Sequence, residues 1–488
     1  MTNLATPHSL PSQRQLFYGG RFHEPKGGFR STVDPATQEP LGLVAHADAA
    51  DVDAAVQAAH AAFASWRKTR PVERAAILRA FALKVREAAD ELGWLDSING
   101  GNPVAEMVND VKVSAHVAEY FAGLVHESKG QTLPMGDGLL NYSMREPLGV
   151  VARIVAYNHP LMFLVTKLAP AVAAGNTVVL KAPDQAPLSA YRLAEIVQQC
   201  FPAGVVNILT GGGECGQALV AHPLVKKATL IGSTATGIAI LRAAADKVMP
   251  VSLELGGKNP IVICPDADLD RAVDGVIKGM NLTWAGQSCG STSRCFVHAS
   301  LYEQVIEALA VRIPERHRCG IPTDPKTTMG SLVSGAHFDK VMGLIDSARE
   351  EGARLVTGGV RSADPALARG WFVEPTVFAD VTPAMRLFRE EVFGPVLTVT
   401  PWDDEDTLIE QVNGLEYGLT ASIWTRDLVR AHRLARRIES GYVWVNQGST
   451  HFLGADFGGY KKSGMGREEG LSELLSFTET KNVNVMLE

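Results

Sequence analysis

Apolar residues recur at helical spacing in the early part of the chain. Val52, Val56 and Phe63 share one face of the stretch 51–66, as expected of a helix that buries that face. The same period continues after Pro71, a residue that suits the first turn of a helix. The pattern therefore predicts that the first hundred residues form a helical layer.

From residue 148 onward the pattern changes to short apolar runs rich in Val and Ile. These runs alternate with segments of helical period, which is typical of a parallel sheet covered by helices on both faces. The expected strands of this region are 148–157, 177–181, 205–210, 227–232 and 251–257.

A second alternating region begins after residue 289 and predicts a second α/β unit. Its expected strands lie in RCFVHA, WFVEPTVFA, PVLTVTPW, LTASIWT and GYVWVNQ. Two more segments, 139–146 and the C-terminal FTETKNVNVMLE, alternate apolar and polar residues at period two and fit neither unit. Strands left at an open edge often pair with each other or with another subunit, so we expect an arm.

Composition and charge narrow the class of protein. The 488 residues are 46% hydrophobic and 20% charged, with a net charge of −7, which is typical of a soluble globular protein. This length suggests roughly three units of ordinary domain size. Nothing in the charge pattern indicates nucleic acid, and we find no apolar run of about 18 residues that could span a membrane. The N-terminal stretch lacks a targeting signal, so we expect a cytoplasmic protein.

The six cysteines have no CxxC or other ligand spacing, which argues against a disulfide framework and against a metal site. Cys289 differs from the other five cysteines because it lies among glycines and serines, in WAGQSCGSTSR. It can be read as a small core residue. The flanking glycine leaves room for a substrate, however, and the polar neighbours disfavour an apolar slot, so Cys289 is also a candidate nucleophile.

Glu254 lies inside the apolar run VSLELGG. It can be a carboxylate at a strand end that faces solvent. If it is buried, its pKa rises toward the range of a useful general base.

Asn158 precedes Pro160, where a helix is expected to begin. Such an Asn commonly caps the helix. The alternative is a donor to a developing oxyanion.

Glycine-rich turns mark a candidate nucleotide site. LKAPD ends one strand, and TGGGECG and IGSTATG stand where two helices are expected to begin. Helix N-termini attract phosphates, although turn chemistry alone also explains such glycines. Gly211, Gly213 and Gly216 match GxGxxG only loosely, and a single match of this kind is weak.

In their order, these elements resemble those of the NAD(P)-dependent aldehyde dehydrogenases from about Phe17 to the C-terminus. The most specific are ELGGK with Glu254, GQSC with Cys289, EEVFGPV at 390–396 and FGGYKKSGMGRE at 457–468. The resemblance implies an α/β fold with a doubly wound, Rossmann-like cofactor domain, an α/β catalytic domain and a small β oligomerisation arm. The implied ranges are 1–126 with 147–256, then 257–470, and 127–146 with 471–488.

The resemblance implies that Cys289 is the nucleophile and that Glu254 activates the hydrolytic water. Asn158 and the backbone N–H of Cys289 would form the oxyanion hole, and Lys181 is counted with the catalytic residues. Attack on the aldehyde would give a thiohemiacetal, hydride transfer to the nicotinamide a thioester, and hydrolysis a carboxylic acid.

The implied cofactor is NAD, with NADP as an alternative. Asp184 stands where the family usually has Glu, and an acid at this position repels a 2′-phosphate, so we favour NAD. The residues expected to bind it are Lys181, Asp184, Gly213, Gly232, Ser233, Leu255, Gly256, Glu391 and Phe393.

The expected aldehyde entrance is mostly apolar and aromatic, which suits aromatic or medium aliphatic aldehydes. Trp284 replaces the family's usual Asn and Asp456 its usual Pro. Trp284 also leaves a betaine-aldehyde-type enzyme open through cation–π contact. The residues expected to line the entrance are Phe163, Thr166, Trp284, Ser288, Gly290, Phe452 and Phe457.

Three rival functions share parts of this pattern. A CoA-acylating dehydrogenase tends to lack the general base, whereas Glu254 is present. A catalytically lost binding protein on the same fold is disfavoured by Cys289, Glu254 and Asn158 together, and a reductase without a covalent step leaves GQSC and ELGGK unexplained. The expected partners are a small aldehyde and further copies of the chain in a homodimer or homotetramer, with no nucleic acid and no membrane.

Overall fold

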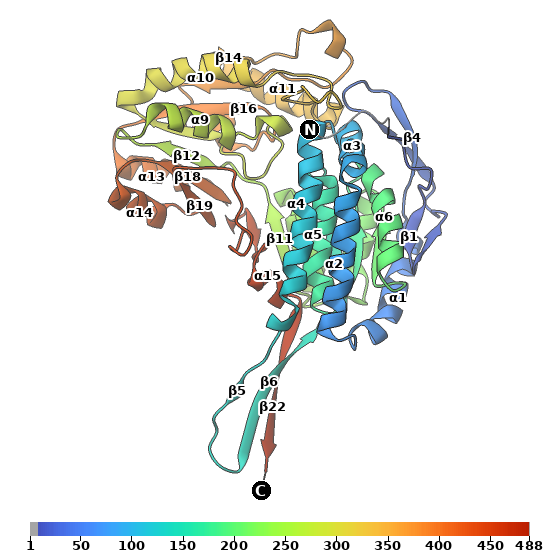
Figure 1. Ribbon diagram of the computed structural model, residues 1–488. Coiled ribbons are helices and arrows are strands. Elements are labelled where there is room, and N and C mark those ends of the chain that lie inside the picture. Colours follow the sequence, from blue (N-terminus) through green and yellow to red (C-terminus); the bar gives the residue numbers. More distant parts are fainter. Residues whose placement is uncertain (1–7, 488) are drawn as a thin grey trace.

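The computed structural model describes residues 8–487. Two α/β lobes lie side by side, and a long β arm projects away from the lobe that contains the N-terminal helices (Figure 1). This agrees with the expected α/β fold class. The division into three domains with the stated boundaries stays a prediction.

The first lobe is organised around a sheet of eight strands within residues 8–487. Its five central strands run parallel, and β1, β2 and β21 extend it as antiparallel edges. In spatial order the strands are β2 (Arg21–His23), β1 (Leu16–Tyr18), β9 (Val206–Leu209), β8 (Thr177–Lys181), β7 (Val150–Ile154), β10 (Val225–Gly232), β11 (Val251–Leu255) and β21 (Gly464–Met465).

Helices cover both faces of this sheet and bury two separate apolar clusters against it. One face carries α2 (Pro71–Glu87), α3 (Ala89–Gly100), α4 (Val104–Gly123), α5 (Pro160–Ala173) and α6 (Leu188–Cys200). The other carries α1 (Ala49–Trp66), α7 (Gly213–Ala221) and α8 (Thr234–Ala245). The five parallel strands coincide with the expected ones, and both faces are covered as predicted.

The expectation of a helical layer throughout the first hundred residues is wrong for residues 16–45. Before α1 this segment forms β1, β2 and a hairpin of β3 (Phe29–Val33) and β4 (Pro40–Ala45). The strands are only three to six residues long. Runs this short carry too few positions for a period-two pattern to stand out.

The second lobe contains a seven-stranded sheet within the described residues, parallel except for its first strand pair. In order its strands are β14 (Arg354–Thr357), β15 (Thr376–Ala379), β16 (Val396–Trp402), β13 (Arg294–His298), β12 (Pro260–Ile263), β18 (Thr420–Trp424) and β19 (Tyr442–Val445). Its helices are α9 (Leu269–Gly279), α10 (Tyr302–Arg316), α11 (Gly335–Glu350), α12 (Arg386–Arg389), α13 (Glu405–Asn413) and α14 (Leu428–Arg437).

The arm consists of the two segments that the sequence left over. In it β6 (Leu139–Pro147) pairs along its whole length with β22 (Thr478–Met486), and β5 (Thr132–Leu133) pairs with β6 on the other side. The helix α15 (Leu471–Leu475) leads into β22. A separate small antiparallel pair consists of β17 (Tyr417–Gly418) and β20 (Tyr460–Lys461). The expected pairing of the leftover strands is confirmed.

Candidate active site

The candidate residues of the first lobe lie at one edge of its sheet. Neighbouring parallel strands place their carboxyl ends together, and ligands of such sheets bind outside those ends. Lys181 ends β8, Ser233 follows β10, Glu254 lies near the end of β11, and Asn158 follows β7 by four residues. The chain order also changes direction between β7 and β10, so Asn158 lies beside the switch point of the sheet.

Asn158 is held by its backbone and leaves its side chain free. It is 2% exposed, and its carbonyl oxygen accepts a hydrogen bond of 3.0 Å from Asn102 Nδ2. Its own Oδ1 is buried and has no hydrogen-bond partner within residues 8–487. Asn158 does not cap α5, because the N-cap position belongs to His159. The amide of Asn158 is therefore available to a ligand.

Cys289 lies on a loop between the short helix η2 (Leu282–Trp284) and β13, partly accessible to solvent. The loop is fixed by Asn259, whose Nδ2 donates to the carbonyl oxygens of Cys289 at 2.7 Å and Ser291 at 3.0 Å. Thr420 Oγ1 donates to the carbonyl oxygen of Gly290 at 3.2 Å. The thiol is therefore presented on a rigid turn instead of filling an apolar slot.

The electrostatic surroundings of Cys289 favour the neutral thiol in the absence of ligands. Burial, together with the charges of Glu254 and Glu391, raises the pKa of the Cys289 thiol to about 12. The backbone N–H groups of Cys289 and Gly290 have the opposite effect and lower the pKa of the thiol. These N–H groups stabilise negative charge next to the sulfur, as an oxyanion hole requires. A thiolate at this position needs a nearby base to take its proton.

Glu254 is a buried carboxyl group without a partner. It is 5% exposed, and both of its carboxyl oxygens lack a hydrogen bond in the described part of the chain. Burial and the charge of Glu468 raise the pKa of Glu254 well above its ordinary value. A side chain at Gly458 would place Cβ only 2.9 Å from Glu254 Oε1, so the glycine leaves the carboxylate its space. The reading as a solvent-facing carboxylate at a strand end is wrong.

A buried ion pair lies close enough to affect Glu254. Lys167 Nζ on α5 pairs with Glu468, and both side chains are 7% exposed. Burial acts to lower the pKa of Lys167, but the charges of Glu468 and Glu473 outweigh it and the pKa is raised. Lys167 therefore stays charged, and its charge lowers the pKa of Glu254 in part.

The residues expected to hold the adenosine end of a nucleotide lie at the ends of β8 and β10. Lys181 is 7% exposed, and burial lowers its pKa, whereas the charges of Cys215 and Asp184 raise it. Ser233 caps α8 by accepting from the backbone N–H of Thr236 at 3.2 Å, and Gly232 directly precedes it. A Cβ at Gly213 would meet no atom within 4 Å, so the start of α7 is open to a ligand.

The other half of the expected cofactor site joins the two lobes. Glu391 Oε1 accepts from the backbone N–H of Gly257 at 2.9 Å, and a Cβ at Gly256 would lie 2.1 Å from Glu391 Oε2. Leu255, just before these glycines, packs over Gly237 of α8. A small pocket there includes Gly257, Ser288, Glu391 and Phe393 in its wall.

Phe393 is held in an unusual backbone conformation. Its φ is 55°, in the left-handed region that non-glycine residues seldom occupy. The ring of His337 makes a hydrogen bond of 2.7 Å to the carbonyl oxygen of Phe393. Burial lowers the pKa of His337 to about 4, so the ring is neutral and donates this bond at physiological pH.

The residues expected at the aldehyde entrance fall into two aromatic groups. Phe163 and Trp284 each contact the ring of His159, at centroid distances of 5.2 and 5.3 Å. Phe457 contacts His451 at 4.7 Å. Of the remaining residues, Thr166 lies on α5, Ser288 and Gly290 flank Cys289, and Phe452 is 51% exposed, at the rim. The backbone N–H of Phe452 donates to the hydroxyl of Tyr442 at 3.4 Å, and the ring of Tyr442 contacts Phe457.

Sequence reasoning missed four residues that shape this site. Asn259 directly follows ELGGK, but nothing in the sequence indicates that its amide holds a loop 30 residues away. His337, on α11, supports Phe393, which lies on the loop before β16. His159 and His451 adjoin residues that were singled out, and each is paired with a carboxylate, Asp110 and Glu469 respectively. These two pairs add polar groups to an entrance that was expected to be mostly apolar and aromatic.

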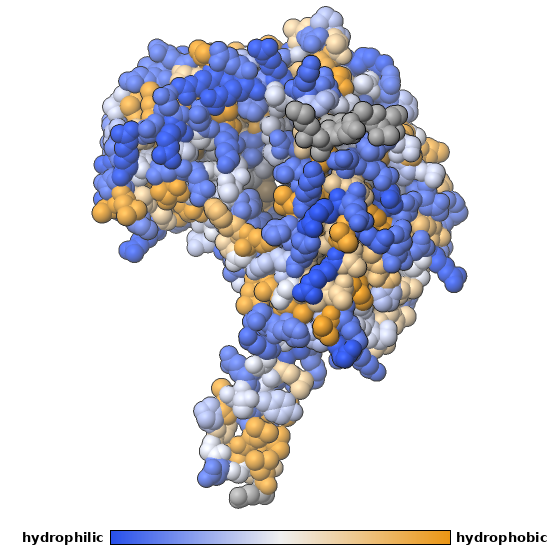
Figure 2. Space-filling model, viewed as in Figure 1, coloured by the Kyte–Doolittle hydropathy of each residue, from blue (hydrophilic) through white to orange (hydrophobic). Residues whose placement is uncertain are grey.

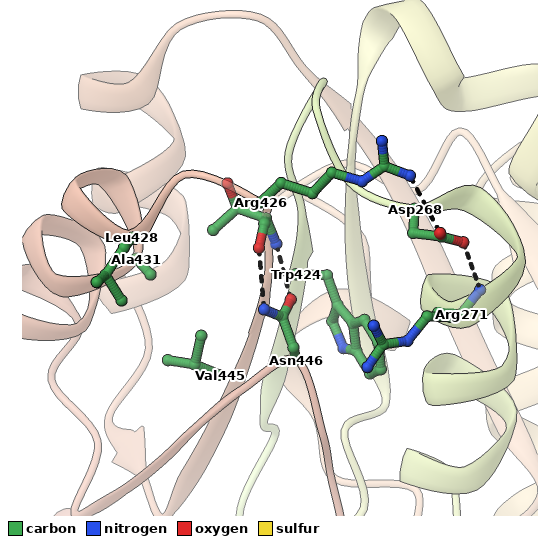
Figure 3. Close-up of a pocket in the computed structure, with 9 residues that line it drawn as sticks. Asp268, Arg271, Trp424, Arg426, Leu428, Ala431, Val445 and Asn446 are labelled. Carbon is green, nitrogen blue, oxygen red and sulfur yellow. Dashed lines mark hydrogen bonds and ion pairs between the residues drawn. The ribbon is translucent and has the colours of Figure 1, made fainter.

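A second pocket lies away from these residues. It has a volume of about 290 Å³ beside β19 and α14 and is lined by Asp268, Trp424, Arg426 and Val445, among others (Figure 3). Arg426 and Asp268 are paired at 3.0 Å on its wall. It contains none of the predicted site residues, so we do not place the reaction there.

Within residues 8–487 no cluster of three or more His, Cys, Asp or Glu side chains is arranged to hold a metal ion.

Asp456, which replaces the family's usual Pro, is fixed by contacts with the segment that leads into the arm. Asp456 Oδ2 accepts from Ser472 Oγ at 2.6 Å, and a Cβ at Gly470 would lie 2.2 Å from Asp456 Oδ1. Asp456 therefore joins its loop to the start of α15, just before the arm. Among the described residues, none of the helices combines the length and the apolar character that crossing a membrane requires.

Comparisons with known proteins agree with this arrangement. Aldehyde dehydrogenase tropH of Talaromyces stipitatus is 51% identical over 98% of this chain and 94% of its own. The NAD⁺ complex of an aldehyde dehydrogenase from Bacillus cereus is 39% identical with a TM-score of 0.95, covering 98% of both chains. An NAD⁺ complex of betaine aldehyde dehydrogenase from Staphylococcus aureus is 33% identical with a TM-score of 0.94, covering 97% of this chain and 95% of that one.

A sequence model of the Aldehyde dehydrogenase family matches residues 22–483, nearly the whole chain. The fold and this match point to a single conclusion: the chain belongs to the aldehyde dehydrogenase family.

Proposed function

We propose that this enzyme oxidises an aldehyde to a carboxylic acid with NAD, through a covalent intermediate on Cys289 that water hydrolyses. The observation that carries the proposal is the proximity of Cys289 and Glu254. Cys289 is partly accessible on a fixed loop, and Glu254 is a buried carboxyl group without a partner that is close enough to raise the pKa of the Cys289 thiol. Such a pair supplies both a nucleophile and a base.

In the proposed mechanism Cys289 Sγ attacks the carbonyl carbon, and the thiol proton passes to Glu254. Asn158 Nδ2 and the backbone N–H of Cys289 bind the oxygen as it becomes negative, a contribution of about 3 kcal/mol for one such donor in other enzymes. NAD, when bound, supplies the acceptor for the hydride that the substrate carbon loses, which leaves a thioester on Sγ. Glu254 releases the thiol proton to solvent and then takes a proton from water as the water attacks the thioester. The C–S bond breaks, the carboxylic acid leaves, and Glu254 returns its proton to Sγ.

The residues present fit a dinucleotide. Lys181 and Asp184 would bind the adenosine ribose, the start of α8 at Gly232 and Ser233 the pyrophosphate, and Glu391 the nicotinamide ribose. The open space above Gly213 and the glycine at 256, where any side chain would collide with Glu391, support this. The NAD⁺ complexes of the Bacillus cereus and Staphylococcus aureus relatives support it as well.

The exposed carboxylate of Asp184 is expected to set the preference for NAD over NADP. Its negative charge repels a 2′-phosphate, so Asp184→Ser should raise the ratio of kcat/KM with NADP to kcat/KM with NAD by about tenfold or more. Steady-state rates with both cofactors measure this ratio. An unchanged ratio, with both cofactors still used, would remove Asp184 from the account of cofactor choice.

The substrate is proposed to be an aromatic or medium aliphatic aldehyde, because Phe163, Trp284 and Phe457 present rings beside the catalytic loop. The relative from Staphylococcus aureus is named a betaine aldehyde dehydrogenase, which favours betaine aldehyde as the second candidate. Cation–π contact with Trp284 would then hold the ammonium group.

We propose that the arm joins copies of the chain into a homodimer or homotetramer. It projects from the body and carries a hydrophobic surface (Figure 2). The exposed apolar side chains on and next to its strands are Leu133, Leu139, Leu140, Met144, Met486 and Leu487. Apolar surface of this kind on a protruding strand usually becomes buried against a partner, and light scattering of the purified chain gives the number of subunits.

Activity with a panel of aldehydes tests the proposed function. We expect NADH formation with NAD alone on benzaldehyde, hexanal or betaine aldehyde, with one mole of carboxylic acid formed for each mole of NADH. Dependence on added CoA, with an acyl-CoA product, would contradict the hydrolytic mechanism. Absence of turnover with every aldehyde and either cofactor, in a protein that still binds NAD, would favour a catalytically lost member of the family.

A further inference from the structure

His159 presents an unsatisfied ring nitrogen beside the oxyanion donor. It follows Asn158 directly, and its Nδ1 makes a hydrogen bond of 2.6 Å to Asp110 Oδ2 on α4. Its Nε2 has no hydrogen-bond partner among residues 8–487. The side chain is 14% exposed, so the imidazole is mostly covered by the residues around it.

Two aromatic rings pack against the imidazole of His159. Phe163 packs edge-on against the imidazole, and Trp284 lies on it at an interplanar angle of 40°. The indole N–H of Trp284 is buried and lacks an acceptor in the described chain. An unpaired buried donor is costly, which makes a ligand that supplies an acceptor favourable here.

The charges around the ring decide which ligand group suits it. Asp110 is 5% exposed and orients the imidazole with Nδ1–H toward its carboxylate, which leaves Nε2 as an acceptor in the neutral ring. Glu106 lies one turn before Asp110 on α4, and its pKa is raised by burial and by the charge of Asp110. Two carboxyl groups thus face one imidazole, which disfavours a further anion.

We propose that His159 selects aldehydes that carry a hydroxyl group, which donates a hydrogen bond to Nε2 while the body of the substrate packs against Phe163 and Trp284. A hydroxyl group both donates and accepts, so it also suits the free indole N–H of Trp284. Asp110 acts as a positioning residue that fixes the orientation of the imidazole. The inference rests on the proposed aldehyde oxidation and names the class of its substrate: hydroxylated aromatic aldehydes.

The test compares substituents of similar size on one ring. The rates are kcat/KM for the hydroxybenzaldehydes and for the methylbenzaldehydes of the same substitution pattern, with 4-carboxybenzaldehyde as the anionic member. Chromatography of the acid product avoids overlap between the absorbance of the hydroxyl aldehydes and that of NADH. In the unmodified enzyme, the best hydroxyl aldehyde should exceed its methyl counterpart by at least about tenfold.

Three variants assign this preference to the imidazole. In His159→Phe the ratio of kcat/KM for the hydroxyl aldehyde to that for the methyl aldehyde should fall to about one, because the acceptor is gone while an aromatic ring still packs against Phe163 and Trp284. Asp110→Asn should lower the same ratio, mainly through KM for the hydroxyl aldehyde, because the carboxylate no longer fixes the ring. His116→Phe makes the same exchange at a histidine 70% exposed on α4 and should leave the ratio unchanged.

The outcomes separate this inference from the proposed function. An enzyme that oxidises methyl and hydroxyl aldehydes equally well overturns the role of His159 and leaves aldehyde oxidation intact. A preference for 4-carboxybenzaldehyde that disappears in His159→Phe overturns the hydroxyl assignment in favour of an anion. Absence of turnover with every aldehyde overturns the proposed function and this inference with it.

Discussion

Cys289→Ala is expected to lower the steady-state rate of NADH formation by roughly 10⁴-fold or more, because the variant lacks the sulfur that forms the covalent intermediate. Asn259 holds the loop through backbone carbonyl oxygens, which the substitution does not touch. The fold and the affinity for NAD should therefore be retained. The rate is measured with saturating NAD and the best aldehyde of the panel, and NAD binding by calorimetry.

The matched control is Cys200→Ala, at the end of α6, which removes a half-buried thiol away from the site. Its activity should be close to that of the unmodified enzyme. NADH formation by Cys289→Ala at more than a few per cent of the original rate would show that the reaction does not need the thiol. The covalent mechanism would then be wrong, and a direct hydride transfer would replace it.

Glu254→Gln is expected to separate the two halves of the reaction. Without the carboxylate, water is no longer activated, so steady-state turnover should fall by about 10²- to 10⁴-fold. The first turnover should still release about one NADH for each subunit, because Sγ can still be acylated. This burst should be slower than in the unmodified enzyme, because Glu254 no longer takes the thiol proton. Stopped-flow absorbance resolves this burst from the steady state.

The same variant carries a prediction about pH. Burial raises the pKa of Glu254, and a base works only when deprotonated, so the deacylation rate should increase as pH rises through that raised value. This rise should disappear in Glu254→Gln and remain in Glu350→Gln, where an exposed carboxylate at the end of α11 is changed instead. Loss of the burst together with the turnover would show that Glu254 is needed already for the attack by Sγ and would contradict the prediction that acylation continues without it.

The parallel strands of both lobes could be predicted from the sequence because each is a short apolar run bounded by turns, and such runs are buried on both faces. The strands at residues 16–45 could not, because their segments are too short for a period to emerge. The arm was predicted from what remained: its alternating residues had no place in either sheet, and β6 and β22 pair with each other.

For the site, motifs led to residues that act locally and failed for residues that act across the fold. Cys289 could be recognised by its glycine neighbours, and Glu254 could be recognised as a charge within an apolar run. Asn259, His337 and His159 do not, because their partners lie 30, 56 and 49 residues away. The free oxygens of Glu254 likewise become visible only once its neighbours are placed.

The most direct test of the account is the mass of the trapped intermediate. Glu254→Gln is mixed with NAD and the best aldehyde of the panel, quenched in acid during the burst, and measured by intact and peptide mass spectrometry. We expect a gain equal to the acyl group of the substrate, located on the peptide that carries Cys289. NADH formed in the same burst with Cys289 unmodified, or with the acyl group on another residue, would contradict the central claim that oxidation proceeds through a thioester on Cys289.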